Sequence, residues 1–503
     1  FLPRQKLIEA VAALIEVETE WVSDNLENMI ENQTLVFIDK IDNTNGVYLR
    51  WVYDCERNIT NRVILSSKFM QSYQGNYDSD IKKVETNLNI VFAENQKKAI
   101  MEACCHQMMI LTGGPGTGKT TTLNGIIKIY ENKGITFTIA APTGRAAKRV
   151  TELTGKDAKT IHRLLEYGNQ NGENTFMRNR ENPLKYDAVI IDESSMIDIW
   201  LFNHLLDAIP ANTKIIMVGD ANQLQPVGPG SVFKDIIASG IIATVELKEI
   251  FRQAKKSLII TNAHRIINGE VPEMKDTKND FFFIPAATPE DVIKKVTELY
   301  CTRLPNAYNL NPLTDIQVLS PTRKTTTGTV SLNIALKNAV NPPDDHKKEL
   351  KFHENTFREG DKIMQVRNNY DITVEKANGE LETGVFNGDI GIIDEILEKE
   401  EGLIVRYDDK KVVYTTEMLE DIELAYAITV HKSQGSEFNA VILPLLDGAN
   451  MLYTRNLLYT AVTRAKKILI ILGSPQKVLS MVKNNITDKR YSGLKFQIWT
   501  MNK

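Results

Sequence analysis

The chain contains little cysteine and no long apolar run. Four cysteines occur among its 503 residues, and none of them is in a C-x-x-C spacing: Cys55, Cys104, Cys105 and Cys301. This argues against a disulfide framework or a cysteine metal site and predicts reduced thiols. No apolar run approaches the roughly 18 residues that span a membrane, and no signal peptide is recognisable. We therefore expect a cytoplasmic protein with no membrane partner.

Charge of one sign is not in excess either. A formal net charge of -4, with 42% hydrophobic and 25% charged residues, is ordinary for a globular protein. This balance does not point to a nucleic-acid binder, but a local basic channel can lie on an acidic protein. The length predicts about three or four domains. Because the chain begins with Phe1 rather than Met, we expect a fragment or a trimmed chain.

The most informative segment is GGPGTGKT, at residues 113–120. It fits G-x-x-x-x-G-K-[ST], a loop that cradles nucleotide phosphates. We expect an apolar strand before it, at 108–111, and an amphipathic helix after it, at 121–130, which is the setting that this loop requires. The residues predicted to bind the nucleotide here are Gly114, Pro115, Gly116, Thr117, Gly118, Lys119, Thr120 and Thr121.

The chemistry of this loop assigns roles to its last residues. Glycines let backbone N–H groups converge on phosphate oxygens, and the helix N-terminus adds partial positive charge. We expect Lys119 to reach the β- and γ-phosphates of ATP and the Thr120 hydroxyl to bind Mg²⁺. The alternative is a glycine-rich turn with a solvated lysine. The full pattern, however, rarely arises by chance in a chain of this length.

Two further predicted strands end in polar side chains suited to ATP hydrolysis. The strand at 187–191 leads to Asp192 and Glu193 at the carboxyl edge of a sheet. We expect Asp192 to hold Mg²⁺ and Glu193 to orient and deprotonate the attacking water. The strand at 214–218 leads to GDANQLQP, where we expect Gln223 to sense the γ-phosphate. Alone, each could be a solvated strand end or a polar turn, but downstream of the phosphate loop they form one set.

These three segments, in this order, resemble a superfamily 1 helicase. Five more segments make the resemblance closest to the RecD-like branch (superfamily 1B, the RecD/TraA subfamily), namely APTGRAA at 141–147, IFRQ at 250–253, the residues 257–272, TVHKSQGSEF at 429–438 and LYTAVTRAK at 458–466. The resemblance covers about residues 86–475.

The resemblance implies an α/β fold with two RecA-like P-loop motor domains. It also implies a β-hairpin insert, an SH3-like β-barrel insert and a small N-terminal accessory domain. We expect the first motor domain at 86–250, with the hairpin insert at 166–186. We expect the second at 251–503, with the barrel insert at about 345–420. Short strands are predicted inside the barrel insert at 362–366, 391–393, 403–407 and 412–414.

Residues 1–85 precede the motor domains in this interpretation. Amphipathic helices are predicted at about 5–16 and 19–31, followed by strands at 34–38 and 46–51 with a turn at Asn43 to Gly46 between them. This pattern could form a small winged-helix-like domain.

The hairpin insert carries a turn signal at Asn171-Gly172. In the subfamily that the chain resembles, a hairpin at this place acts as a pin that splits the duplex. Phe176 and Met177 could present an apolar wedge to the DNA. A polar loop without this function is the alternative.

The resemblance also gives roles to three residues outside the phosphate loop. It implies that Arg252 and Arg464 are arginine fingers of the second motor domain, which neutralise charge on the transferring phosphoryl group. It implies that Gln96 reads the edge of adenine. Taken alone, each arginine could form a surface salt bridge, and Gln96 could be a solvated helix cap.

DNA contacts are expected on loops at the strand ends of both motor domains. The strand at 316–320, for example, leads to Pro321-Thr322. Contacts of this kind go to backbone phosphates and base faces, so binding should tolerate sequence changes and weaken with salt. The candidates are Thr143, Arg145, His162 and Arg163 in the first domain and Pro321, Thr322, Arg323, His431 and Lys432 in the second.

Together these features predict an ATP-dependent DNA helicase, a DNA-stimulated ATPase that uses ATP and Mg²⁺. Its partners would be single-stranded DNA and junctions of single- and double-stranded DNA, and we expect a monomer. The resemblance implies 5′ to 3′ movement, which the residues themselves do not fix. One alternative is a single-stranded DNA translocase or the motor subunit of a repair or recombination nuclease complex. Another is a nucleotide-regulated DNA-binding subunit without turnover.

Overall fold

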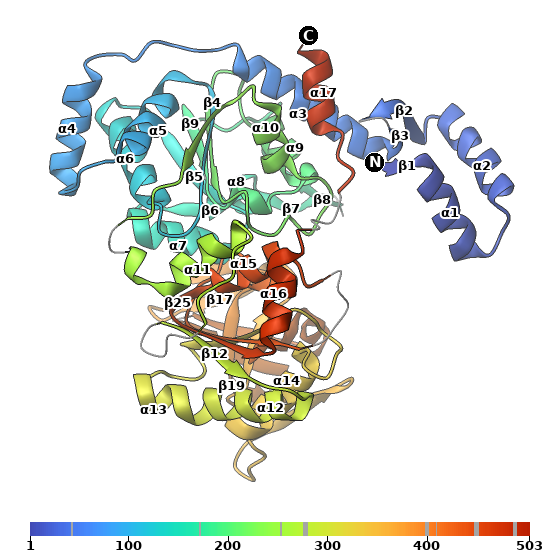
Figure 1. Ribbon diagram of the computed structural model, residues 1–503, viewed down its shortest axis with the longest axis vertical. Helices are drawn as coiled ribbons and strands as arrows, with labels where there is room; N and C mark the ends of the chain where they lie inside the picture. The colour runs from blue at the N-terminus through green and yellow to red at the C-terminus, as the bar shows by residue number, and fades with distance from the viewer. Residues whose placement is uncertain are drawn as a thin grey trace.

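The computed structural model describes residues 1–41, 44–170, 173–251, 254–274, 280–397, 402–408, 410–446, 452–485 and 490–502. Arg252, Asn43 and the Asn171-Gly172 turn signal lie outside these residues. Two α/β domains stack one above the other, and an arm extends from one side (Figure 1). In the described part of the chain, no helix combines the length and the apolar character needed to cross a membrane.

The arm is the N-terminal segment. Its three strands pair in the order β1-β3-β2, and two helices pack on them through Ile8, Val22 and Val47. The elements of the arm are β1 (Leu2–Pro3), α1 (Arg4–Ile15), α2 (Thr19–Glu31), β2 (Leu35–Ile41) and β3 (Thr44–Leu49). Two helices then lead onto the first domain, namely α3 (Arg50–Ser67) and α4 (Tyr77–Leu88).

The strand predicted at 46–51 ends earlier than expected. Arg50 and Trp51 begin α3 instead of ending β3. The reason is tertiary packing, because Ile59 and Val63 lie at helical spacing and are completely buried against the core of the first domain.

A six-stranded parallel sheet forms the centre of the first domain. The strand order is β11-β4-β10-β9-β5-β6, so β4, which leads to the phosphate loop, lies between two neighbours. Every residue of β4 is buried, as expected for a parallel sheet that helices cover on both faces. The strands are β4 (Met108–Gly113), β5 (Phe137–Ala141), β6 (Ala158–Thr160), β9 (Ala188–Ile191), β10 (Lys214–Gly219) and β11 (Ala243–Leu247).

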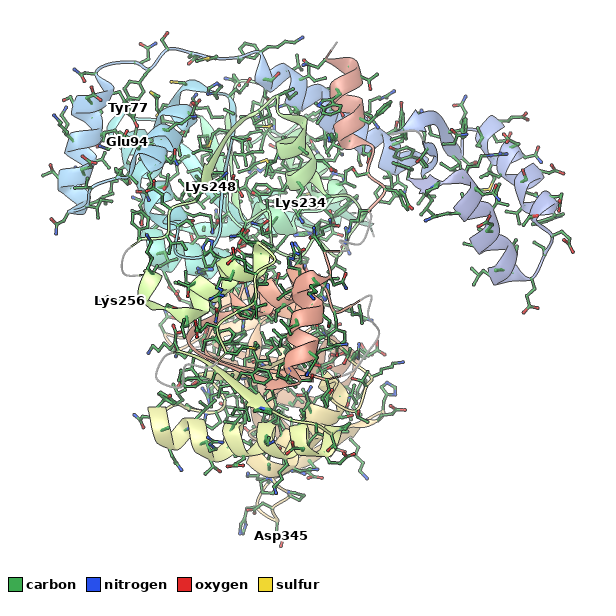
Figure 2. The ribbon with its side chains drawn as sticks, in the orientation of Figure 1. Tyr77, Glu94, Lys234, Lys248, Lys256 and Asp345 are labelled. Atoms are coloured by element: carbon green, nitrogen blue, oxygen red, sulfur yellow. The ribbon has the colours of Figure 1, made fainter. Side chains whose placement is uncertain are left out.

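Helices lie on both faces of this sheet (Figure 1). They are α5 (Glu94–Cys105), α6 (Lys119–Asn132), α7 (Gly144–Thr154), α8 (Ile161–Leu164), α9 (Ile199–Ala208) and α10 (Val232–Ser239). Helix α4 packs at the outer edge, where Figure 2 shows Tyr77 beside Glu94. The Tyr77 hydroxyl donates a hydrogen bond to the Lys97 carbonyl of α5.

A two-stranded antiparallel hairpin follows α8. It consists of β7 (Tyr167–Gln170) and β8 (Glu173–Phe176). Phe176 is buried, with its ring centroid 4.7 Å from that of Tyr167. The expectation that Phe176 is part of an exposed apolar wedge is therefore wrong, because this ring completes the core of the first domain. Met177 is half-buried.

The second domain is built on a five-stranded parallel sheet in the order β12-β25-β24-β13-β23. Its strands are β12 (Phe281–Pro285), β13 (Ile316–Ser320), β23 (Ala427–Thr429), β24 (Phe438–Leu445) and β25 (Ala465–Gly473). Its helices are α11 (Leu258–Ile267), α12 (Pro289–Glu298), α13 (Leu304–Tyr308), α14 (Thr329–Val340), α15 (Arg455–Val462) and α16 (Pro475–Lys483). The face of α15 that carries Leu457 and Ala461 packs in the core of this domain.

An antiparallel β insert leaves the second domain after α14 and returns at β23. Its main sheet has seven strands in the order β18-β17-β21-β20-β19-β16-β22, around a core that includes Ile363 and Val405. The loop before it, with Asp345, lies at the end of the molecule away from the first domain (Figure 2). The strands of the insert are β14 (Glu349–Phe352), β15 (Asn355–Arg358), β16 (Lys362–Gln365), β17 (Asn369–Lys376), β18 (Leu381–Val385), β19 (Ile390–Leu397), β20 (Gly402–Tyr407), β21 (Lys410–Tyr414) and β22 (Ile422–Leu424).

The last helix returns to the first domain. Helix α17 (Leu494–Met501) lies beside α3 in Figure 1 and also packs on α10. The buried carboxylate of Glu56 accepts hydrogen bonds from the Gly493 N–H at 3.1 Å and from Gln497 Nε2 at 3.0 Å. Arg490 donates to the Gly230 carbonyl at 3.0 Å. The chain therefore connects the two domains a second time, through its C-terminal segment.

A buried network of polar groups fastens the insert to the second domain. Asp361 is fully buried, and its carboxylate lies 2.8 Å from Lys337 Nζ of α14. It also accepts hydrogen bonds from Asn341 Nδ2 at 2.8 Å, the Tyr426 hydroxyl at 3.0 Å and the Arg358 N–H at 2.8 Å. Every one of these donors would lose a partner if the carboxylate were removed.

We predict that Asp361→Ala destabilises the second domain by about 3–5 kcal/mol, because it leaves the Lys337 charge buried and unpaired. The measurement is the free energy of unfolding from denaturant titration. As a control, Asp394→Ala removes an exposed partner of Arg406 in the same insert and should cost no more than about 1 kcal/mol. Equal losses in the two variants would contradict the role given to the buried network.

Candidate active site and nucleic-acid interface

A cavity of about 780 Å³ lies between the two domains. The phosphate loop and the ends of β9 and β10 form one wall, and the segments around 254–260 and 463–467 form the other. The structure brings eleven of the predicted residues to this cavity, namely Gly114, Pro115, Gly116, Gly118, Lys119, Thr120, Thr121, Asp192, Glu193, Gln223 and Arg464.

The phosphate loop depends on glycine at two positions. Gly116 and Gly118 have φ angles of 72° and 83°, in the left-handed region that side chains disfavour. A Cβ atom at Gly118 would lie 2.5 Å from Gln96 Nε2 and 2.6 Å from Phe251 Cε2. Glycine at position 118 therefore lets the side chains of Gln96 and Phe251 approach the backbone of the loop closely.

Two side chains brace the loop from inside. Lys119 Nζ donates to the carbonyls of Gly113 at 2.7 Å and Gly114 at 3.1 Å, so the ammonium lies over the backbone of the loop. Thr117 Oγ1 donates to the Gly114 carbonyl at 2.9 Å. Thr117 is buried and lies outside the set that lines the cavity, so its hydroxyl supports the loop from behind.

Gln96 contacts the loop without lining the cavity. Its Oε1 accepts from the Ala93 N–H at 3.0 Å, and its Nε2 donates to the Gly118 carbonyl at 3.3 Å. Both ends of the amide are thus held within the first domain. Its role toward adenine stays a prediction.

The carboxylates at the end of β9 occupy a desolvated position. Burial, and then the charge of the neighbouring Glu193, raise the pKa of Asp192 to about 6. Glu193 itself has a φ angle of 51°, an uncommon backbone conformation for a side-chain-bearing residue that often marks functional sites. A divalent cation beside Asp192 would favour its ionised form.

Gln223 and the glycines complete a site that fits a nucleoside triphosphate. The Oε1 atom of Gln223 is buried and makes no hydrogen bond within the described residues. A buried, unpaired acceptor facing a cavity is costly unless a ligand or water satisfies it. With the Thr120 hydroxyl and the Asp192 carboxylate on the same wall, the donor set also fits Mg²⁺, which prefers oxygen ligands.

Arg464 is one of the cations that the second domain contributes to this cavity, together with Lys466 and Lys467. Its side chain is only 2% exposed. Its Nε and Nη1 atoms donate to the carbonyls of Thr460 and Ser436, each at 3.2 Å, and its Nη2 donates to Thr463 Oγ1 at 3.2 Å. The guanidinium is therefore held by its own domain at the cavity wall opposite the phosphate loop.

The segment next to Arg252 touches the phosphate loop. Phe251 donates from its N–H to the Gly116 carbonyl at 3.2 Å. Arg252 itself lies outside the described residues, so its predicted role as an arginine finger stays a prediction.

Polar contacts join the two domains beside the cavity. The Tyr459 hydroxyl on α15 donates to Asp220 Oδ2 at 2.5 Å, and burial raises the pKa of Tyr459 well above its usual value. The Leu224 N–H donates to Thr460 Oγ1 at 3.0 Å, and the Leu224 carbonyl accepts from Gln434 Nε2 at 3.0 Å. The second domain thus contacts the segment after β10 both before and after Gln223 in the sequence.

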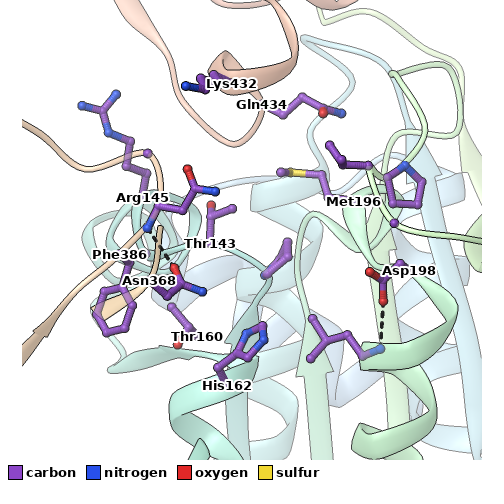
Figure 3. A pocket seen from close by; sticks show the side chains of 18 of the residues that line it. Thr143, Arg145, Thr160, His162, Met196, Asp198, Asn368, Phe386, Lys432 and Gln434 are labelled. Atoms are coloured by element: carbon purple, nitrogen blue, oxygen red, sulfur yellow. Dashed lines mark hydrogen bonds between the residues drawn. The ribbon is translucent and has the colours of Figure 1, made fainter. Parts of the chain in front are cut away.

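A second cavity, of about 260 Å³, lies where both domains meet the insert (Figure 3). It brings together five of the predicted DNA-binding residues: Thr143, Arg145, His162, His431 and Lys432. Its other lining residues were not among the predicted DNA contacts; they include Met196, Pro226, Asn368, Tyr370, Phe386 and Gln434. Pro226 and Gln434 belong to segments that carry the family resemblance, whereas no local sequence pattern marks Asn368, Tyr370 and Phe386 of the insert, which packing brings to the cavity.

The walls of this second cavity combine aromatic side chains with a small number of charged side chains. Burial lowers the pKa of His162 to about 4, so the ring is neutral at pH 7. Its centroid lies 5.6 Å from that of Tyr167 and 6.1 Å from that of Tyr370 of the insert. Arg145 donates to Ser436 Oγ at 3.2 Å. Flat faces beside a few cations suit stacked bases of a single strand.

Four of the predicted DNA-binding residues lie outside this cavity. Pro321 and Thr322 are buried, because the residues after β13 fold over its end, and the Thr322 hydroxyl lies 2.6 Å from that of Thr325. Arg323 pairs with Glu423 at 2.7 Å. Arg163 lines a neighbouring groove between α7 and the insert.

Comparisons with known proteins identify the family. Residues 96–229 match the model of an AAA domain, 332–407 that of the ATP-dependent RecD-like DNA helicase SH3 domain, and 424–472 that of the UvrD-like helicase C-terminal domain. The chain is 36% identical over 385 residues to the ATP-dependent RecD2 DNA helicase of Deinococcus radiodurans, covering 76% of this chain and 49% of that protein. This chain belongs to the RecD-like superfamily 1 helicases.

The chain is also similar to two other proteins of known name. The RecBCD enzyme subunit RecD of Mycolicibacterium smegmatis is 27% identical over 434 residues, covering 80% of this chain and 74% of that protein. A crystal structure of Bacteroides Pif1 bound to ssDNA is 20% identical, covering 77% of this chain and 94% of that chain, with a TM-score of 0.44. The chain spans about half the length of the RecD2 relative.

The family also explains the architecture of the RecD-like chain. Its two α/β domains are RecA-like domains, and its antiparallel insert is the SH3-like domain, as predicted. The seven-stranded sheet of the insert falls largely within the matched residues 332–407.

We predict that His162 makes the protein less stable in acid. Its pKa of about 4 in the folded protein lies below the unfolded value near 6.5, so its contribution is complete above pH 6.5 and is lost as the pH falls toward 4. His162→Phe should therefore reduce the loss of unfolding free energy between pH 7.5 and pH 5 by about 2 kcal/mol. His346→Phe, at an exposed position of the second domain, serves as the control. An unchanged pH dependence in His162→Phe would contradict the burial argument.

Proposed function

We propose that this chain is the motor of an ATP-dependent DNA helicase that moves along single-stranded DNA. The observation that carries the proposal is the cavity between the two RecA-like domains. There Lys119, Glu193 and Gln223 of the first domain face Arg464 of the second. The printed names of the RecD2 and RecD relatives, a DNA helicase and a RecBCD subunit, support it.

ATP hydrolysis follows from the chemistry of these side chains. Lys119 leaves the loop carbonyls and binds the β- and γ-phosphates. Glu193 orients a water molecule and accepts its proton, while the amide group of Gln223, whose oxygen has no partner within the described residues, contacts the γ-phosphate region. Arg464 neutralises the charge that develops on the transferring phosphoryl group. Thr120 and Asp192 would hold Mg²⁺, which supplies charge neutralisation on the phosphate oxygens.

The second cavity supplies the path for DNA in this proposal. The segment after β10 joins the two sites, because Gln223 lines the nucleotide cavity and Pro226 lines the second one. Tyr459 and Thr460 hold the same segment from the second domain. Loss of the γ-phosphate at Gln223 would therefore change the contact between the two domains and shift the bound DNA strand. Domain motions of this kind couple chemistry to movement. We propose 5′ to 3′ movement by analogy with the RecD-like family.

A translocase that does not separate strands by itself is the second candidate. The observation that favours it is the hairpin of β7 and β8, which is short and whose Phe176 ring is buried rather than offered to a duplex. If the hairpin separates strands, replacing residues 168–175 by a short glycine linker should abolish unwinding and leave DNA-stimulated ATP hydrolysis intact. Unwinding that survives this replacement would show that another element separates the strands, whereas a wild-type protein that hydrolyses ATP without unwinding would favour the translocase.

Strand separation tests the proposed function. We expect a partial duplex with a 5′ tail to be unwound in the presence of ATP and Mg²⁺, and one with a 3′ tail to stay paired. Glu193→Gln should remove the activity. Unwinding of the 3′-tailed duplex alone would reverse the direction. Hydrolysis stimulated by single strands, with neither substrate opened, would favour the translocase.

We predict that Lys119→Ala lowers the rate of ATP hydrolysis by about 10²–10³-fold, because it removes a preorganised positive charge from the phosphates. The measurement is steady-state hydrolysis with saturating single-stranded DNA. Lys128→Ala is the matched control, since it removes a lysine of the same helix that pairs with Glu131. Full activity of Lys119→Ala would overturn the assignment of the nucleotide site.

A further inference from the structure

Arg149 on α7 connects carboxylates of the two domains. Its Nη2 atom lies 2.5 Å from Glu437 Oε1 of the second domain, and its Nη1 atom lies 3.6 Å from Glu193 Oε1 of the first. All three side chains line the nucleotide cavity. The shorter contact shows that the guanidinium is engaged chiefly by Glu437, which leaves Glu193 at a looser distance.

Helix α7 makes a second contact with the same segment, one helical turn away. Arg145, four residues before Arg149, donates to Ser436 Oγ at 3.2 Å, and Ser436 directly precedes Glu437. Arg145 lines the second cavity, where we place DNA, whereas Arg149 lines the nucleotide cavity. One helix thus holds two consecutive residues of the second domain, one at each site.

We propose that Arg149 is a positioning residue that makes Glu193 available only when the second domain is docked. In the docked arrangement Glu437 holds the guanidinium closely, and Glu193, at 3.6 Å, is held loosely enough to orient water. When the second domain withdraws, Arg149 loses Glu437, pairs with Glu193 and draws that carboxylate away from the nucleotide. This inference rests on the proposed function and adds to it a reason why hydrolysis depends on DNA.

DNA acts on this arrangement through the other end of α7. A strand bound beside Arg145 would stabilise the contact between α7 and the segment that carries Ser436 and Glu437. The same contact keeps Arg149 on Glu437. Lys466 also lies near Glu437, with its Nζ atom 3.9 Å from Oε2, so removing Arg149 does not leave the Glu437 charge without a cation.

Three variants separate this role from a structural one, namely Glu437→Gln, Arg149→Gln and the double variant. Steady-state ATP hydrolysis is measured with and without an oligothymidine strand. In Glu437→Gln, Arg149 turns to Glu193, and kcat with DNA should fall about tenfold with little change in KM. Arg149→Gln should raise hydrolysis without DNA several-fold. The double variant should regain most of the kcat that Glu437→Gln lost, because the competing cation is gone.

The matched control is Lys148→Gln, which removes the neighbouring positive charge of α7. Lys148 pairs with Asp408 of the insert, away from the nucleotide cavity, so the ratio of rates with and without DNA should stay unchanged. A double variant no faster than Glu437→Gln would overturn the proposal, as would a large rise in KM for ATP, since Glu437 would then act on the nucleotide itself.

The same assays distinguish failure of the proposed function from failure of the role given to Arg149. A wild-type protein without DNA-stimulated hydrolysis, or a Glu193→Gln variant that keeps it, would overturn the proposed function and this inference together. Normal wild-type behaviour with no rescue in the double variant would overturn only the role of Arg149.

Discussion

The hydrogen bonds between α15 and the segment after β10 are the contacts on which both sites depend. Tyr459 and Thr460 bind Asp220 and Leu224 across the interface, and the two cavities lie on either side of this junction. Because these groups are buried, separating them without new partners costs free energy. The C-terminal segment, anchored through Glu56 and α17, adds a second connection. The domains can therefore change their separation only by exchanging these polar contacts.

Much of the fold could be predicted from the sequence, because buried parallel strands are continuous apolar runs with polar ends. The strand expected at 316–320 is β13 with the same bounds, and the strand expected at 187–191 differs from β9 by one residue. The errors at Trp51 and Phe176 have a common cause. Both residues fit an exposed or extended local pattern, and only packing against distant elements puts Trp51 in a helix and buries Phe176.

The two sites differ in how far the sequence could predict them. The nucleotide residues come from short loops whose chemistry is local, so Lys119 and Asp192 could be identified from their motifs and lie together in one cavity. Tyr370 and Arg149 could not, because their significance comes from neighbours about 200 or more residues away, His162 for the one and Glu437 for the other. Pro321 is the opposite case. Its place after a strand predicted a DNA contact, but the chain that follows covers this strand end and buries the residue.

The central claim is that the nucleotide is held by both domains at once. The most direct test is a structure of the protein with ADP, aluminium fluoride and an oligothymidine strand. We expect Lys119 Nζ and the Arg464 guanidinium to contact the fluoride from opposite sides, with Arg464 released from the Ser436 carbonyl that it now binds. A fluoride group contacted by the first domain alone, with Arg464 still bonded to Ser436, would contradict the account.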